Sequence, residues 1–429
     1  MIADRPVAIV GGGFSGLMTA AQLARRGVAS ILFDGSGRIG RGVAYSTTEA
    51  AHLLNVPAGK MSAWPDRPDD FARFAQDDGT GFAQRRLYGR YLGEILDSAP
   101  GVVRSEVAVV AAIPSEGGWR LSLADGTTVE AAALVLATGN EAPAPFARFA
   151  EVAGFVSNPW SSEAHAAVAR VAAEGSGILL IGTGLTAIDT MLSPAAAGHR
   201  GTITALSRRG LVPRAHASFE PAPVPLDAVP LGQLVALWRW VRNRSAEVGF
   251  RAAVDSLRPH SHAIWQALSP SAQRRFLRHA RPWWDVHRHR IAPEVAALME
   301  ARKAAGKLEV IAGRIRGARG DDKRVTLRIA ARDGTAIERD AGLVVNCTGP
   351  LGAMAKTQDR LLKQMVDDGL ATADPLGIGI AADAHDAATA SERLWVLGPL
   401  SKARQWEIIA VPDIRQQAQA VAEAITRVR

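Results

Sequence analysis

The chain contains the same pattern of strand, glycine turn and helix twice. The first copy begins with the apolar run Val7–Val10, followed by the letters GGGFSG and an Ala/Leu-rich helical stretch from Leu17 to Arg26. The second begins with the apolar run Ile178–Ile181, followed by GTGLTA and a helical stretch from Ile188 to Leu192. A buried strand that runs into a glycine turn and then a helix opens a dinucleotide-binding unit. The repeat therefore predicts two such units on one chain.

The two copies also end alike. Each closes with a polar Asp-Gly-Thr turn, at 125–127 and at 333–335, and then an apolar strand that stops at Thr-Gly, at Gly139 and at Gly349. Alternating strands and helices predict an α/β fold with parallel sheets covered on both faces and ligands at the carboxyl ends of the strands. We predict two Rossmann-like dinucleotide-binding domains, the second with a helical insertion.

Changes in the pattern along the chain suggest where the domains begin and end. We expect residues 1–150 to form the first part of one domain, 151–345 the second domain, and 346–429 the part that returns to the first. Within the second domain, residues from about 226 to 305 form long helical stretches rich in Trp and Arg, which predicts the insertion. The returning part should contain a strand at Leu394–Leu397 and a last helix from about Pro412 to Arg427.

The first glycine loop has the spacing of a pyrophosphate site. Gly11, Gly13 and Gly16 form GxGxxG directly after a strand, and Asp34 ends the next strand eighteen residues after Gly16. The glycines allow a tight turn, a close approach of the backbone to phosphate, and close packing of helix on strand, while the acid suits a ribose hydroxyl. The alternative is a glycine turn without a ligand.

The second glycine loop has Gly182 and Gly184, with Ala187 in the third position, which the fingerprint tolerates. The strand that follows ends in Ser207-Arg208-Arg209 rather than in an acid. Two guanidinium groups can hold a 2′-phosphate through charge-assisted bonds, so this loop favours NADPH over NADH. The alternative is an arginine pair on a solvated surface.

Composition excludes several other classes of protein. Cys347 is the single cysteine, so an internal disulfide and a dithiol redox centre drop out, and no His/Cys cluster has metal-ligand spacing. The net charge of +8 comes mainly from arginines that form no compact basic run, so we expect no nucleic-acid partner. No apolar run is long enough for a membrane span or a signal peptide, which favours a cytoplasmic protein. Homo-oligomer formation is left open.

Six segments together resemble a known family. They are GGGFSG, GVAYST (42–47), NVPAGKM (55–61), GTGLTAID (182–189), SRRGLVPR (207–214) and WEIIAVPDIR (406–415). In combination the chain is similar to the bacterial FAD/NAD(P)-binding protein family, which is related to the flavoprotein monooxygenases with two dinucleotide-binding domains. The resemblance runs nearly end to end.

The resemblance implies FAD at the first loop and NADPH at the second, and it assigns residues to each cofactor. The expected FAD residues are Gly11, Gly13, Phe14, Ser15, Gly16, Asp34, Gly42, Val43, Asn55, Met61, Thr138, Gly139, Gly398, Trp406 and Glu407. The expected NADPH residues are Gly182, Thr183, Gly184, Leu185, Arg208 and Arg209. Asn55 is the one candidate for a catalytic role near the reactive part of the flavin; otherwise it braces a turn before Pro57. Trp406 can equally be a core residue.

The resulting hypothesis is an FAD-dependent, NADPH-using monooxygenase in which reduced flavin forms a hydroperoxide with O₂ and oxygenates a small-molecule substrate. The fingerprint histidine of Baeyer–Villiger enzymes is missing at 154–160, which disfavours that reaction. Two alternatives stay open. One is a reductase or dehydrogenase that does not oxygenate. The other is a nucleotide-regulated flavin-binding scaffold that docks a partner through Leu237, Trp238 and Trp240.

Two smaller expectations concern single segments. Cys347 lies in an apolar strand, so we expect it to be buried and to pack rather than react. The block Trp283–Arg290 alternates aromatic, acidic, imidazole and guanidinium groups; we expect its Trp pair in the core and its His and Arg side chains on a solvated face.

Overall fold

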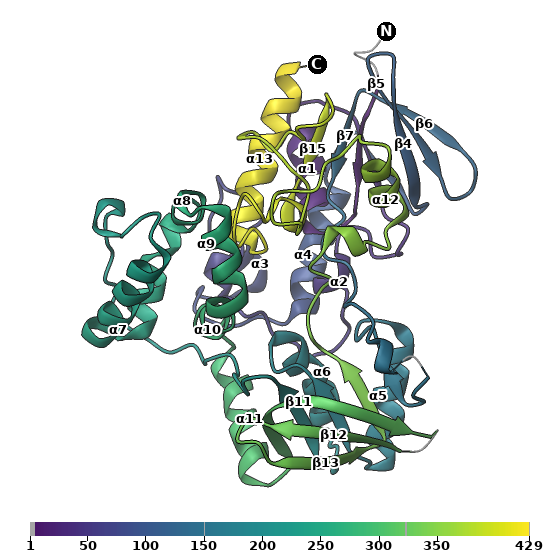
Figure 1. The fold of residues 1–429 in the computed structure, drawn as a ribbon. Coiled ribbons are helices and arrows are strands. Elements are labelled where there is room, and N and C mark those ends of the chain that lie inside the picture. Colours follow the sequence, from purple (N-terminus) through teal and green to yellow (C-terminus); the bar gives the residue numbers. More distant parts are fainter. Residues whose placement is uncertain (1–4, 150, 322–323, 429) are drawn as a thin grey trace.

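The computed structural model describes residues 5–149, 151–321 and 324–428 of the protein. Figure 1 shows two sheet-containing units, one above the other, with a group of helices beside them. In the upper unit, five parallel strands form a sheet in the order β15-β7-β1-β2-β3. The strands are β1 (Val7–Val10), β2 (Ser30–Phe33), β3 (Val102–Ser105), β7 (Ala133–Leu136) and β15 (Leu394–Val396). The last strand of the chain thus returns beside β7.

Alternation along the buried strands gives this sheet two apolar faces. Val7 and Ile9 pack toward α1 (Phe14–Ala24), α4 (Arg85–Asp97) and α13 (Val411–Val428), and α13 lies along α1 (Figure 1). Ala8 and Val10 face the opposite way, because side chains in a strand alternate between faces. That second face is covered by a small antiparallel sheet and by α12 (Arg360–Asp367). The small sheet contains β4 (Val109–Ser115), β5 (Gly118–Leu123) and β6 (Thr128–Ala131).

The lower unit has seven strands in the order β13-β12-β11-β10-β9-β14-β8. They are β8 (Phe155–Val156), β9 (Ile178–Ile181), β10 (Ile203–Ser207), β11 (Leu308–Gly320), β12 (Val325–Ala331), β13 (Ala336–Ala341) and β14 (Leu343–Asn346). The strands from β8 to β11 are parallel, and β12 and β13 are antiparallel. The order β14-β9-β10-β11 repeats β7-β1-β2-β3. The predicted duplication and the α/β class are confirmed.

The two copies differ in how the antiparallel strands are attached. In the upper unit β4 to β6 form a separate sheet, whereas in the lower unit β11 pairs with β10 in its first part and with β12 in its second. Both predicted Asp-Gly-Thr turns are hairpin turns, between β5 and β6 and between β12 and β13. One face of the lower sheet packs on α5 (Ser162–Glu174), α6 (Leu185–Ala196) and α11 (Pro293–Ala304).

The insertion is helical, as the sequence predicted. It contains α7 (Leu234–Ser256), α8 (Ser261–Ala267), α9 (Pro270–Arg275), a π-helical turn (Phe276–Ala280) and α10 (Arg281–Arg288). The following helix, α11, lies instead on the lower sheet, because Val295 and Met299, four residues apart, are buried in that core. None of the helices in the described ranges is long and apolar enough to cross a membrane.

Candidate functional site

The first glycine loop joins β1 to α1 and is packed too tightly for side chains. Gly11 has a φ of +109°, and a Cβ there would lie 2.2 Å from the carbonyl oxygen of Ala137 at the end of β7. A Cβ on Gly16 would lie 1.9 Å from the Gly11 oxygen, where α1 crosses its own strand. Two of the three glycines are therefore required by the fold itself, with or without a ligand.

Gly13 is different, because a side chain there would meet no clash. It is the N-cap of α1 with ordinary extended backbone angles, and no side chain caps the helix. A Cβ on Gly13 would approach only the Cα of Gly42, at 3.8 Å. The first turn of α1 holds no acidic residue. The positive end of α1 thus has neither a side-chain cap in the described ranges nor an acid in its first turn, which suits the binding of phosphate.

Asp34 follows β2 and holds the loop in place. One carboxylate oxygen accepts the Gly12 N–H at 3.1 Å, and the other accepts the N–H of Ser36 at 2.8 Å and its hydroxyl at 2.5 Å. The side chain is half-buried at the edge of the loop. Its predicted bond to a ribose hydroxyl remains a prediction, and a carboxylate with two oxygens retains acceptor capacity for it.

The ends of β7 and β15 meet the same loop. Gly398 has a φ of +62°, and a Cβ on it would lie 2.6 Å from the Ser15 hydroxyl oxygen on α1. A Cβ on Gly139 would meet nothing within 4 Å. The Thr138 hydroxyl is buried without a hydrogen-bond partner in the described ranges, which leaves a polar atom for a ligand to satisfy. The structure therefore brings Ser15, Thr138 and Gly398 together at one sheet edge.

A buried polar chain fixes the position of Gly398. Its N–H donates to the Gln417 side-chain oxygen on α13 at 2.8 Å, and the Gln417 amide donates to Asp386 at 2.9 Å. Gln405 donates to the same oxygen of Asp386 at 2.6 Å. Burial raises the pKa of Asp386 to about 6, while the bond from Gln417 works in the opposite direction. Sequence analysis gave no sign of this chain, because Asp386 and Gln417 belong to no motif.

Asp386→Asn should alter the pH dependence of stability. Because the folded pKa of about 6 lies above the ordinary 3.8, the stabilising form is the protonated one. Its contribution is complete below about pH 4 and is lost as the pH rises through 6. Asn is neutral at every pH and still accepts both amide donors. The variant should therefore equal the parent at pH 4 and exceed it at pH 7 by up to about 3 kcal/mol in unfolding free energy. Urea unfolding at both pH values measures this; parallel profiles would contradict it.

Three other expected FAD residues have distinct surroundings. Val43, in the short helix α2 (Gly42–Tyr45), is 43% exposed. Met61 is buried in the core of the upper unit. Asn55 is half-buried, and its backbone carbonyl accepts a hydrogen bond from His216 Nε2 at 3.0 Å. Contact of these residues with a flavin stays a prediction.

His216 is a candidate residue that sequence analysis missed. It lies two residues beyond the SRRGLVPR motif, on the loop after β10, and it reaches across to Asn55 in the upper unit. Its ring packs on Phe82 at 4.9 Å between centroids. Burial lowers the pKa of His216, so the neutral ring donates from Nε2. The nearby SRRGLVPR motif was the one sequence signal that could have drawn attention to His216. A single histidine in a loop does not, however, reveal which residue it will contact.

Trp406 and Glu407 lie against the insertion. The Trp406 ring stacks on Trp265 at 4.8 Å, and its indole N–H is buried without a hydrogen-bond partner in the described ranges. Glu407 accepts hydrogen bonds from the Trp284 indole and, at 3.0 Å, from Arg288. It has a φ of +71°, which is strained for a side chain other than glycine. Their expected role beside a flavin is untested; their observed partners are helices of the insertion.

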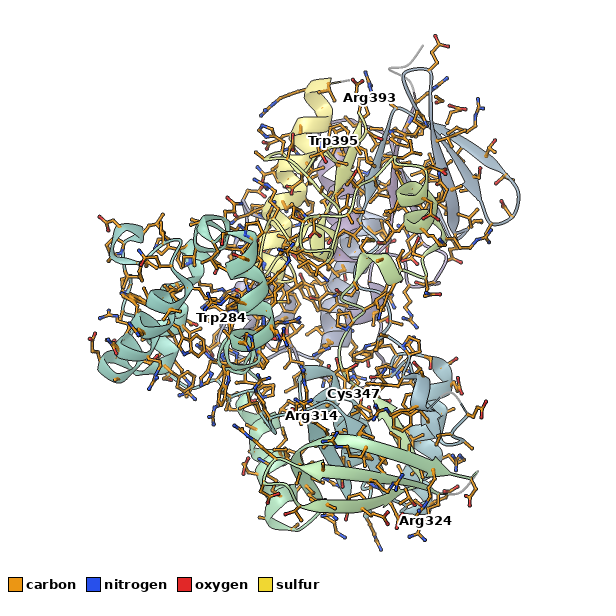
Figure 2. The ribbon with its side chains drawn as sticks, in the orientation of Figure 1. Trp284, Arg314, Arg324, Cys347, Arg393 and Trp395 are labelled. Carbon is orange, nitrogen blue, oxygen red and sulfur yellow. The ribbon has the colours of Figure 1, made fainter. Side chains whose placement is uncertain are left out.

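The solvated face predicted for the block Trp283–Arg290 is wrong. The Arg288 and Arg290 side chains are only 9% and 3% exposed, and Arg290 forms an ion pair with Asp255 at 2.9 Å. Burial lowers the pKa of His289. Trp283, expected in the core, is 37% exposed. The reason is that these side chains have protein partners. Trp284, labelled in Figure 2, and Arg288 bond to Glu407, while Arg290, just beyond α10, bonds to Asp255 on α7.

The second glycine loop repeats the geometry of the first. Gly182 has a φ of +129°, and a Cβ there would lie 2.2 Å from the carbonyl oxygen of Cys347, which follows β14. Gly184 is the N-cap of α6, and a Cβ on it would meet nothing within 4 Å. The Thr183 hydroxyl donates to the Leu211 carbonyl oxygen and accepts from the Ser207 hydroxyl, which holds the loop against the end of β10. Leu185 is half-buried on the lower core.

Arg208 and Arg209 follow β10 beside this loop. Arg208 is exposed and Arg209 half-buried. Neither guanidinium has an ion pair or a hydrogen bond within the part of the chain that the structure describes. Both are therefore available to an anion from solution. Cys347 is buried, as expected, and burial raises its pKa to about 12, so it is an unreactive thiol.

Comparisons with known proteins agree with this architecture. Residues 8–141 match the family described as FAD-NAD(P)-binding. No curated protein matches the sequence. Among solved structures, an ornithine hydroxylase from Pseudomonas aeruginosa has a TM-score of 0.65 at 15% identity, and an L-lysine 6-monooxygenase from Pseudomonas syringae has 0.67 at 17%. Each pair covers 99% of both chains. A flavin-containing monooxygenase from Stenotrophomonas maltophilia has 0.56 at 20%, covering 99% of this chain and 98% of its own.

Proposed function

We propose that this chain, whose residues 8–141 match the FAD-NAD(P)-binding family, is an FAD-dependent, NADPH-using oxidoreductase and a monooxygenase of small molecules. The observation that carries the proposal is the pair of glycine loops, at Gly13 and Gly184, each at the carboxyl ends of parallel strands and each leading into a helix without a side-chain cap. Such edges bind dinucleotides. The solved structures with this architecture include an ornithine hydroxylase, a lysine monooxygenase and a flavin-containing monooxygenase.

The residues of the first loop suit FAD. The N-terminus of α1 has no side-chain cap, Gly13 places no side chain over it, and the buried Thr138 hydroxyl lacks a partner in the described ranges. When bound, FAD would accept a hydride from NADPH and deliver the electrons to O₂. The protein would hold the phosphates through the N–H groups at the start of α1. The hydrogen bond from the Gly398 N–H to Gln417 would keep the end of β15 in place beside them.

The second loop suits NADPH. The N–H groups at the start of α6 would hold its pyrophosphate, and Arg208 and Arg209 would hold its 2′-phosphate. Asn55 and His216 meet where the loop after β10 touches the upper unit. We propose that this contact borders the reaction space, with the neutral His216 keeping the Asn55 segment in place. A single buried cysteine supports a reaction without dithiol chemistry.

We further propose that the insertion selects the substrate. Trp265 donates to the Ala403 carbonyl oxygen at 2.7 Å, and Trp284 and Arg288 bind Glu407. The helices therefore cover the segment that resembles the flavin-side motif. Substrate pockets in shared folds are built by such variable parts. We also propose that the domain boundaries lie near residues 150 and 345 and that the protein is cytoplasmic.

The test compares the amount of NADPH consumed with the amounts of H₂O₂ and oxygenated product formed. The proposed stoichiometry is NADPH + H⁺ + O₂ + substrate giving NADP⁺ + H₂O + oxygenated substrate. Protein reconstituted with FAD is mixed with NADPH without oxygen while the flavin colour is followed. Oxygen is then added with L-ornithine or L-lysine, the substrates named for two of the similar structures, and NADPH, H₂O₂ and product are measured.

Flavin bleaching followed by one oxygenated product per NADPH would support the proposal. Bleaching followed only by H₂O₂, over a wide set of small amines, would favour a reductase that does not oxygenate. If the protein binds no FAD, the proposal is wrong, and so is the alternative of a flavin-binding scaffold.

A further inference from the structure

A buried polar contact fastens the two sheet-containing units to each other. Arg85, the first residue of α4, lies 3.0 Å from Asp189 on α6, and their side chains are only 14% and 7% exposed. Arg85 also donates from Nε to the Leu53 carbonyl oxygen at 3.0 Å. Because charges cost much free energy when they leave water, a buried pair needs both partners. The removal of either partner leaves an uncompensated charge at the junction.

A second residue of the upper unit binds the same helix. His52 is 4% exposed, and its Nε2 lies 3.0 Å from the Asp189 carbonyl oxygen and 3.1 Å from the Ser193 hydroxyl. A carbonyl oxygen can only accept, so Nε2 carries the proton and Nδ1 accepts from Thr47, 2.9 Å away. Asp189 and Ser193 are four residues apart and therefore share one face of α6. That face is turned toward the upper unit.

Apolar residues surround the polar contact. Ala51, Leu53 and Phe82 belong to the upper unit by sequence, yet they pack on the core of the lower unit. The contact of Arg85 and His52 with α6, called the joint below, is thus buried among apolar side chains and is not a surface ion pair. Burial raises the pKa of Asp189, which the nearby Arg85 and His52 partly offset.

The joint lies on α6 close to the glycine loop that would bind NADPH. Gly184, at the start of this helix, borders the loop that would hold the NADPH pyrophosphate, and Asp189 lies little more than one turn further on. The loop that would hold FAD belongs to the other unit. Hydride transfer needs the two rings at contact distance, and misplacement by about 1 Å can cost 100-fold in rate. A contact on α6 that lies outside both glycine loops is placed to set that distance.

We propose that Arg85 and Asp189, supported by His52, are positioning residues that fix the NADPH loop against the FAD-binding unit for hydride transfer. This rests on the proposed function. The pair acts on the orientation of the units and not on the affinity of either loop. Substitution should therefore separate the rate of flavin reduction from cofactor binding.

The variants are Arg85→Met, which keeps the length of the stem without its charge, Asp189→Asn, and Arg85→Lys as the conservative form. Arg339→Met is the matched control, since Arg339 pairs with Glu309 within the lower sheet. We expect Arg85→Met and Asp189→Asn to slow anaerobic flavin reduction by NADPH about 10- to 30-fold. FAD content, affinity for 2′,5′-ADP and reduction by dithionite should stay within about twofold. Arg85→Lys should recover most of the rate, and Arg339→Met should match the parent.

A second measurement does not depend on activity. Hydrogen–deuterium exchange of the protein without cofactors should increase in residues 47–55 and in α6 for both charge-removing variants, and not for Arg339→Met. If NADPH fails to reduce the parent protein, the proposed function is wrong. If NADPH reduces the parent and both variants equally fast, or if 2′,5′-ADP affinity falls in step with the rate, the positioning role is wrong. If both variants fail to fold, the pair is structural and the inference is also wrong.

Discussion

Gly13→Asp should abolish FAD binding and leave the fold intact. The residue has ordinary extended backbone angles, and a Cβ there approaches only Gly42, at 3.8 Å. Asp is a favourable N-cap, so α1 itself should tolerate or gain from the change. Its carboxylate would, however, stand where the pyrophosphate must approach the helix N-terminus. We expect the Kd for FAD to rise at least 100-fold, which corresponds to about 2.7 kcal/mol or more.

The reciprocal variant makes this test specific. Gly184→Asp places the same group at the N-cap of α6, where a Cβ meets nothing within 4 Å. It should leave FAD bound and weaken NADPH to a similar extent. Flavin absorbance after reconstitution and calorimetric titration with NADP⁺ measure the two affinities, and circular dichroism monitors the fold. If Gly13→Asp binds FAD with the parental affinity, the first loop does not bind the FAD pyrophosphate.

The double variant Arg208→Ala/Arg209→Ala should lower the preference for NADPH over NADH. Both guanidinium groups lack partners in the described ranges, so removing them costs the fold little. Hydrogen bonds to charged groups contribute about 1.5–3 kcal/mol each, and exposure of Arg208 reduces its share. We expect kcat/KM for NADPH to fall about 100-fold in flavin reduction, while the value for NADH changes less than about threefold.

Arg200→Ala is the control for general charge effects. Arg200 is also exposed, but it precedes β10 and therefore lies at the opposite end of that strand from Arg208 and Arg209. Its removal should leave both cofactors unaffected. Equal losses for NADPH and NADH in the double variant would show that the arginines do not read the 2′-phosphate.

The sequence by itself determined the duplicated α/β architecture and the two glycine loops. These features are local: a buried strand, a tight turn and a helix lie within about twenty residues, and only glycine fits where Gly11 and Gly182 approach a neighbouring strand. The hairpins at 125–127 and 333–335 are local in the same sense. Local patterns survive whatever the rest of the chain does, so they can be read before the fold is known.

The tertiary structure alone decided which polar side chains meet between the units. Arg85 and Asp189 are far apart in the sequence, Asn55 and His216 are separated by 161 residues, and Glu407 and Trp284 by 123. The burial of Arg288, predicted as solvated, follows from the same contact with Glu407, and that of Arg290 follows from its ion pair with Asp255 within the insertion. Such contacts depend on how completed units pack against each other. No spacing along the sequence encodes that packing, because the periodicity of a helix tells which face is apolar and not what will cover it.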